Sequence, residues 1–102
     1  MKEKQNPNYV CVHAGQLKDE VYGGATAPIY TSTAYDYRGE GTNLYPRYFN
    51  TPNQVALGRK MAALEHTEAG MIFGSGMAAI SAVFMAFLKT GDHIILQRAL
   101  YG

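Results

Sequence analysis

Apolar residues recur with helical spacing only in the second half of the chain. Thr51 is followed directly by Pro52, and Gln54 comes three residues after the threonine. A hydroxyl N-cap, a proline at the first helical position and a glutamine at the third together form a capping box, which starts helices. We therefore expect a helix from about residue 51 to residue 66. Its buried face should carry the residues at i, i+4 and i+7, which are Leu57, Met61 and Leu64.

A second helix and two short strands are expected after residue 70. Apolar residues 71–73 form the first strand, and Gly74-Ser75-Gly76 follows at once. The next helix should bury Met77, Ile80, Phe84, Phe87 and Leu88. A turn over residues 90–92 then leads to a second apolar strand over residues 93–96. Two strands joined by a crossover helix predict an α/β fold with a parallel sheet.

The first half of the chain has a different character. No sustained helical period occurs between residues 1 and 50, where glycines and prolines interrupt the pattern repeatedly. Aromatic and β-branched residues over 29–35 favour an extended backbone. Six of the eight tyrosines lie between Tyr9 and Tyr45, which is unusual for a solvated tail. We interpret residues 1–50 as an arm that packs against another surface, which is either the rest of the chain or a partner subunit. We interpret residues 51–102 as the start of a truncated α/β domain.

Composition and charge narrow the class of protein. The chain has 102 residues, a net charge of +1 and a single cysteine, Cys11. This charge gives no case for binding nucleic acid or an anionic membrane. Neither a signal peptide nor an apolar run of about 20 residues is present, and one cysteine fits a reducing compartment. We expect a cytoplasmic protein. His13, His66 and His93 lie on different elements and predict no metal site.

The turn Gly74-Ser75-Gly76 is the main candidate for chemistry. Glycines at the start of a helix let a ligand approach the backbone, and the free N–H groups of the first turn bind anions such as phosphate. An ordinary tight turn with Ser75 as N-cap explains the same residues. The spacing Gly74-x-Gly76-x-x-Ala79 also matches a dinucleotide-binding fingerprint, although Gln97 and Arg98 stand where an acidic residue is usual. A small NADP- or phosphate-binding module is therefore an open alternative.

Several separate motifs resemble one enzyme family. In the second half these motifs are Ser75-Gly76-Met77-Ala78-Ala79-Ile80, Gly91-Asp92-His93 and Leu100-Tyr101-Gly102. Upstream they are Val12-His13-Ala14-Gly15, Ala27-Pro28-Ile29-Tyr30, and Tyr45-Pro46-Arg47 followed by Asn50. Together they resemble the N-terminal part of the Cys/Met-metabolism pyridoxal-phosphate-dependent enzymes. That family includes cystathionine γ-synthase, cystathionine β- and γ-lyases, methionine γ-lyase and the O-acylhomoserine sulfhydrylases.

The resemblance implies a fold and a cofactor site. The fold would be that of fold-type I pyridoxal-phosphate transferases, similar to aspartate aminotransferase, in which an N-terminal arm precedes a mainly parallel sheet flanked by helices. Ser75 and the backbone N–H groups of Gly76 and Met77 would bind the cofactor phosphate of the same subunit. Tyr45 and Arg47 would reach from the arm into a neighbouring subunit of a homodimer or homotetramer and bind that subunit's cofactor phosphate.

Catalysis would depend on residues that this chain mostly lacks. Tyr101 would stack on the pyridine ring of the cofactor and act as a catalytic residue. The lysine that binds the cofactor covalently, and the arginine that holds the substrate carboxylate, come later in the family. The full-length protein would catalyse β- or γ-elimination, or γ-replacement, on sulfur amino acids or O-acylhomoserine, whereas these 102 residues alone are expected to be inactive.

The chain departs from the family pattern in the loop that carries Arg47. Pro46 stands where serine or threonine is common, and Asn50-Thr51-Pro52 replaces the usual Asn-Pro-Thr. These changes leave the phosphate role in place and alter the expected geometry of the loop.

Overall fold

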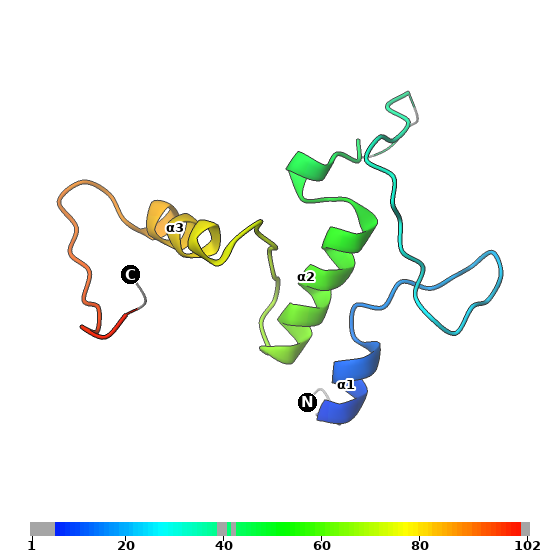
Figure 1. Cartoon of the computed structure of the whole chain (residues 1–102), viewed down its shortest axis with the longest axis horizontal. Coiled ribbons are helices and arrows are strands. Elements are labelled where there is room, and N and C mark those ends of the chain that lie inside the picture. The colour runs from blue at the N-terminus through cyan, green and yellow to red at the C-terminus, as the bar shows by residue number, and fades with distance from the viewer. Residues whose placement is uncertain (1–5, 39–40, 42, 101–102) are drawn as a thin grey trace. The chain divides into compact units, whose positions relative to one another are not determined.

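A computed structural model of the chain describes residues 6–38, 41 and 43–100 (Figure 1). The helices of this part are α1 (Pro7–His13), the single 3-10 turn η1 (Pro46–Tyr48), α2 (Pro52–Leu64) and α3 (Gly76–Phe87). The chain divides into two compact units, Met1–Ile72 and Phe73–Gly102. The first unit contains α1, η1 and α2, and the second contains α3.

Helix α2 begins where the capping box predicts. The backbone N–H of Thr51 donates to Oε1 of Gln54 at 3.3 Å, and the Thr51 hydroxyl donates to the same oxygen at 2.7 Å. The helix ends at Leu64, two residues earlier than expected. At this end His66 adopts a left-handed conformation with φ +56°, and the N–H of Thr67 donates to the carbonyl of Ala62 at 2.9 Å. This 6→1 bond is the signature of a Schellman ending.

The predicted buried face of α2 is wrong. The three large apolar side chains expected there are 47%, 42% and 36% exposed, in the order Leu57, Met61 and Leu64. The buried residues are Gly58 and Ala62 instead. Gly58 lies against the backbone of Gly70 so closely that a Cβ added to Gly58 would be 2.6 Å from the Gly70 carbonyl oxygen. Two glycines permit this approach, and a search for large apolar side chains cannot detect it.

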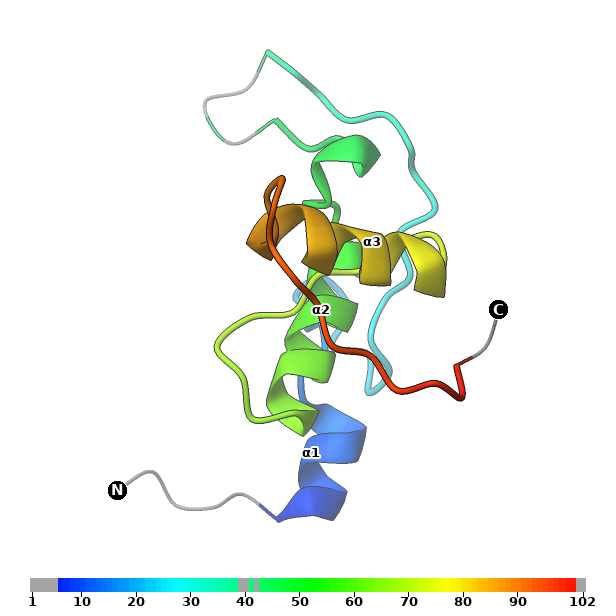
Figure 2. The ribbon, with the colours of Figure 1, turned by 90° about the vertical axis from the view of Figure 1, so that its left-hand side faces the viewer.

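Helix α1 was not expected from the sequence. Its start signal is nevertheless present, because Asn6 accepts a hydrogen bond from the N–H of Asn8 at 2.9 Å and Pro7 occupies the first position. Seven residues are too few to establish an apolar period. Val10 is buried, and α1 packs beside the C-terminal end of α2 (Figures 1 and 2).

Two further contacts attach the arm to α2. Nζ of Lys60 donates to the carbonyl oxygens of Cys11 and Val12 at 3.0 and 3.1 Å, so that a cation binds the C-terminal end of α1. Asn53 pairs with the backbone of Tyr30: Oδ1 accepts from its N–H at 3.1 Å and Nδ2 donates to its carbonyl at 2.6 Å. The arm therefore contacts α2 of its own chain. Packing on a partner subunit stays a prediction.

A loop in the arm is organised by one carboxylate. Asp19 accepts hydrogen bonds from the backbone N–H groups of Tyr22, Gly24 and Val21 at 3.0, 3.1 and 3.1 Å. These bonds, that from Tyr22 first, stabilise the charged form and lower the pKa of Asp19 below its usual value.

In the second unit, α3 starts as predicted but does not bury the expected side chains. Met77, Ile80 and Phe87 are 63%, 47% and 80% exposed. The described remainder of this unit is irregular, so no second element covers the apolar surface of the helix. The expected turn after the helix is confirmed, since Lys89 and Asp92 bond to each other and Gly91 has φ +96°.

The strands predicted over residues 71–73 and 93–96 are absent. No residue from 6–38, 41 or 43–100 is assigned to a β-strand. A strand exists only when a neighbouring strand accepts and donates its backbone hydrogen bonds. Residues 71–72 and 93–96 belong to different units, and neither segment has such a neighbour within its described unit. The parallel sheet is thus not confirmed.

Candidate functional site

Tyr45 and Arg47 lie together on the turn η1. The N–H of Tyr48 donates to the Tyr45 carbonyl at 2.9 Å, and the N–H of Phe49 donates to the Pro46 carbonyl at 3.2 Å. Pro46 occupies the first position of this turn, where a residue without an N–H is tolerated. The substitution of proline for the family's serine or threonine is therefore compatible with the turn.

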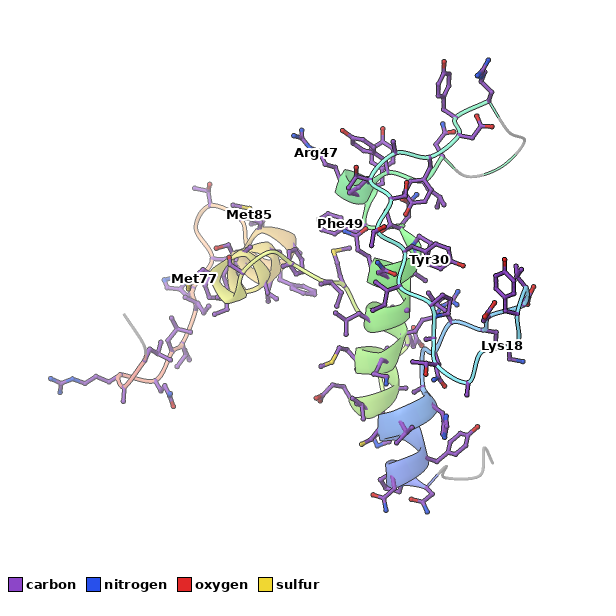
Figure 3. All side chains as sticks on the ribbon, turned by 45° about the vertical axis from the view of Figure 1, so that its right-hand side comes forward. Lys18, Tyr30, Arg47, Phe49, Met77 and Met85 are labelled. Carbon is purple, nitrogen blue, oxygen red and sulfur yellow. The ribbon has the colours of Figure 1, made fainter. Side chains whose placement is uncertain are left out.

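The guanidinium of Arg47 is exposed and projects outward from η1 (Figure 3). Within the described ranges it has no hydrogen-bond or ion-pair partner. The Tyr45 ring, 46% exposed, packs edge-to-face against Tyr48 with ring centroids 5.3 Å apart. An unpaired guanidinium offers several hydrogen-bond donors to an anion, and arginine binds phosphate oxygens well because its donors are planar and charged.

Three side-chain hydrogen bonds from the α2 end hold this turn. Asn50 accepts from the N–H of Tyr45 at 2.9 Å and donates from Nδ2 to the carbonyl of Asn43 at 2.8 Å. Nε2 of Gln54 donates to the carbonyl of Pro46 at 3.0 Å. Sequence reasoning treated Asn50 only as part of a motif and Gln54 only as a helix cap. Their position just after the turn, together with their paired donor and acceptor atoms, is the signal that could have identified them.

Ser75, Gly76 and Met77 form a second group at the start of α3. The hydroxyl of Ser75 accepts from the N–H of Ala78 at 3.1 Å, so the serine is the N-cap. The first N–H groups of a helix have no partner within it, and they carry the positive end of the helix dipole. A Cβ added to Gly74 or Gly76 would meet nothing within 4 Å, and the first turn contains no acidic residue. This open, positively polarised backbone fits a phosphate group.

The two groups of predicted site residues belong to different units of the chain. The structure brings Tyr45 and Arg47 together, and separately Ser75, Gly76 and Met77. Tyr101 lies outside the described residues.

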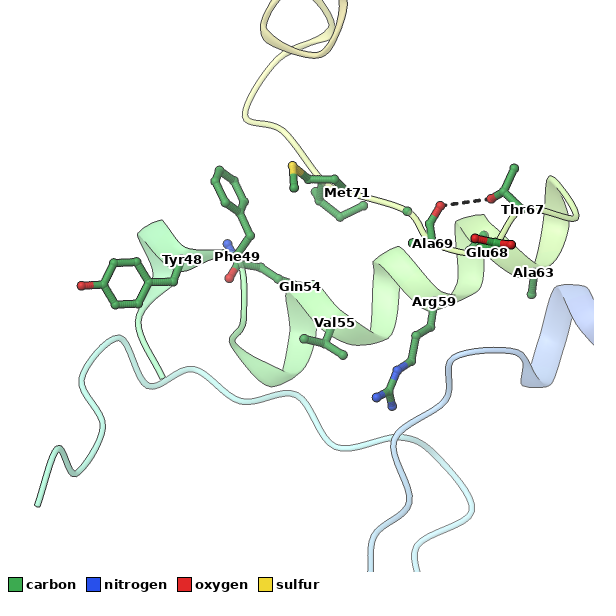
Figure 4. Close-up of a pocket in the computed structure, with 13 residues that line it drawn as sticks. Tyr48, Phe49, Gln54, Val55, Arg59, Ala63, Thr67, Glu68, Ala69 and Met71 are labelled. Atoms are coloured by element: carbon green, nitrogen blue, oxygen red, sulfur yellow. Dashed lines mark hydrogen bonds between the residues drawn. The ribbon is translucent and has the colours of Figure 1, made fainter. Parts of the chain in front are cut away.

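A hollow of the first unit lies apart from these two groups of residues. It has a volume of about 560 Å³ and is lined by η1, α2 and the segment over residues 67–72 (Figure 4). Phe49, Val55, Met71 and Ile72 give it a mainly apolar wall, with Arg59 and Glu68 among its lining residues. Of the predicted site residues that the structure describes, none lines it.

The described residues contain neither a membrane-spanning helix nor a cluster of metal ligands. None of the helices there is long and apolar enough to cross a membrane. No three His, Cys, Asp or Glu side chains of the described ranges come together as metal ligands would.

Known proteins resemble this chain over most of its length. The family model described as "Cys/Met metabolism PLP-dependent enzyme" matches residues 8–102. A cystathionine γ-synthase/O-acetylhomoserine (thiol)-lyase of Bacillus subtilis is 43% identical over 90 residues, which are 86% of this chain and 24% of that protein. An L-methionine γ-lyase of Fusobacterium nucleatum is 35% identical, over 98% of this chain and 28% of that protein.

A solved crystal structure also resembles this chain. The crystal structure of metB from Corynebacterium glutamicum matches with a TM-score of 0.75 and 38% sequence identity, over 87% of this chain and 24% of that one. This likeness supports the expected fold family, that of fold-type I pyridoxal-phosphate enzymes. The chain spans about a quarter of the length of the curated relatives it matches.

The small NADP-binding module considered from the glycine turn has no support in these comparisons. A match over residues 8–102 covers most of the arm together with η1, α2 and α3. The chain belongs to the family of Cys/Met metabolism pyridoxal-phosphate-dependent enzymes.

Proposed function

We propose that this chain is the N-terminal part of an enzyme that uses pyridoxal phosphate to eliminate or replace the β or γ substituent of sulfur amino acids or of O-acylhomoserine. The observation that carries the proposal is the family match over residues 8–102, with 43% identity to a cystathionine γ-synthase/O-acetylhomoserine (thiol)-lyase. The proposal includes both elimination and γ-replacement, because the relatives are named as lyases and as synthases.

In this proposal the start of α3 binds the cofactor phosphate. The N–H groups of Gly76 and Met77 donate to phosphate oxygens, and the Ser75 hydroxyl adds a donor while its oxygen keeps the bond from Ala78. Bound pyridoxal phosphate supplies an electron sink for the carbanion that forms when the substrate loses its α proton. Tyr101, as the resemblance implies, would stack on the cofactor ring and act as a catalytic residue.

The arm supplies the second half of a phosphate site in the neighbouring subunit. Tyr45 and Arg47 are both exposed at one turn, and a contact across subunits requires such exposure. The protein would then be a homodimer or a homotetramer of such dimers, located in the cytoplasm, and no site would be complete in a monomer.

The full-length protein loaded with pyridoxal phosphate tests the proposal. We expect it to release ammonia and a 2-oxo acid from cystathionine or methionine, or to form a thioether from O-acetylhomoserine and a thiol. The variant Arg47→Met should lose this activity at low cofactor concentration and regain it at high concentration. Lys18→Met, which changes a different exposed cation of the arm, is the matched control. If the full-length protein reacted with none of these substrates, that result would contradict the proposal.

A further inference from the structure

We propose that Asn50, assisted by Gln54, is a positioning residue that holds the backbone of Tyr45 and Pro46 so that Arg47 points at the cofactor phosphate. The inference rests on the proposed function and adds a role for residues whose side chains do not themselves contact the phosphate. The side-chain amides of Asn50 and Gln54 form hydrogen bonds with the backbone on the N-terminal side of Arg47.

The turn that carries Arg47 has little stability of its own. It consists of three residues closed by two backbone hydrogen bonds of 2.9 and 3.2 Å. Single 3-10 turns have poor hydrogen-bond geometry, and one isolated turn does not offset its conformational entropy. Phe49, which ends the turn, has φ +55°, a left-handed conformation that costs a non-glycine residue about 1 kcal/mol or more. Outside contacts must therefore hold the turn.

Asn50, in the segment between η1 and α2, and Gln54, in α2 itself, supply these contacts. The Asn50 side chain bridges the N–H of Tyr45 and the carbonyl of Asn43, and the Gln54 side chain binds the carbonyl of Pro46. Both amides are partly buried, and Gln54 lies in the first turn of α2. The backbone on the N-terminal side of Arg47 is thus tied to the start of the helix.

Arg47 depends on this support because no other contact among the described residues directs its side chain. No described residue bonds to its guanidinium, so its aim follows from the backbone that carries it. A paired bond from guanidinium to phosphate is sensitive to direction, and a displacement of about 1 Å in a supporting loop is enough to weaken such a site. Loss of the Asn50 bridge should therefore weaken phosphate binding without removing a phosphate ligand.

Asn53 provides a matched control. Its side chain likewise binds one backbone N–H and one backbone carbonyl, but both belong to Tyr30 instead of to Tyr45 and Asn43. Asn50→Leu and Asn53→Leu each remove two hydrogen bonds and replace the amide by an apolar group of similar size. Only Asn50→Leu should change the contribution of the phosphate to binding.

The measurement compares two ligands of the full-length apoprotein, pyridoxal phosphate and pyridoxal, which lacks the phosphate. The dissociation constant of pyridoxal divided by that of pyridoxal phosphate is a ratio that reports the contribution of the phosphate alone. We expect Arg47→Met to reduce this ratio by about 10-fold or more, as for loss of a charged hydrogen bond. Asn50→Leu should reduce it by about fivefold, and Asn53→Leu should leave it within about twofold. In the Arg47→Met background, Asn50→Leu should have no further effect.

A second variant keeps the inference testable if Asn50→Leu does not fold. Gln54→Glu retains the oxygen that binds Thr51 but loses the Nε2 donor to Pro46. Its effect on the ratio should also vanish in the Arg47→Met background, whereas a direct charge repulsion would persist there. Equal ratios for Asn50→Leu and Asn53→Leu, with Arg47→Met still reduced, would overturn the positioning role alone. An unchanged ratio in Arg47→Met would overturn the proposed role of Arg47 as well.

Discussion

Replacing Gly58 by alanine should destabilise the first unit, although the same change stabilises most helices. Gly58 lies inside α2, where alanine is normally better than glycine by about 1 kcal/mol. Here, however, the added Cβ would be 2.6 Å from the carbonyl oxygen of Gly70, whereas ordinary contacts begin near 3.4 Å. The segment that carries Gly70 would have to move by about 0.8 Å, the difference between these two distances. Overpacking of this kind costs about 1–3 kcal/mol.

The net result is an expected loss of about 1 kcal/mol, because the clash exceeds the gain in helix propensity. Gly74→Ala is the matched control, since a Cβ at this position meets nothing within 4 Å. That variant should be neutral or slightly more stable, by up to about 1 kcal/mol, because it restricts the unfolded chain. Urea unfolding of the two full-length variants, followed by far-UV circular dichroism, measures the difference. A Gly58→Ala protein as stable as the Gly74→Ala protein would refute the close approach of the two backbones.

Three further perturbations test individual contacts of the first unit. Lys60→Met removes two charge-assisted bonds to the last carbonyls of α1, so the amides of α1 should exchange hydrogen about fivefold faster, and unchanged exchange would contradict this contact. Hydrogen bonds from backbone N–H groups, that of Tyr22 first, lower the pKa of Asp19. The ionised carboxylate therefore stabilises its loop fully at pH values above the ordinary aspartate pKa of about 3.9, and this stabilisation is lost as the pH falls through the lowered pKa. An NMR titration should show this loss, and Asp19→Asn should abolish it. His66→Gly should raise stability by about 0.5–1 kcal/mol, because φ is +56° at this helix ending, and a lower melting temperature would contradict that geometry.

Local signals in the sequence predicted the local structure well. The capping box at Thr51 and Gln54 marked the start of α2, and Ser75 marked the start of α3. Both depend on hydrogen bonds between residues at most three positions apart, so the necessary partners are adjacent in the sequence. The same is true of α1, whose signal at Asn6 was present but belonged to a helix too short to show a period.

Features that depend on distant partners could not be predicted. The expected strands require neighbouring strands, and the buried face of α2 is set by Gly70, twelve residues away from Gly58. The support of the candidate site has a similar origin, since Asn50 and Gln54 act on backbone groups five to eight residues away. From the sequence alone, amides in such positions cannot be distinguished from ordinary loop or cap residues, because their hydrogen-bond partners are unknown.

The central claim is that this chain is the first part of a pyridoxal-phosphate enzyme. The most direct test is the absorbance spectrum of the full-length protein after incubation with pyridoxal phosphate and removal of the excess. We expect a visible cofactor band that remains with the protein and disappears on treatment with borohydride. The variant Arg47→Met should have a lower affinity for the cofactor. A full-length protein that retains no cofactor band would contradict the claim.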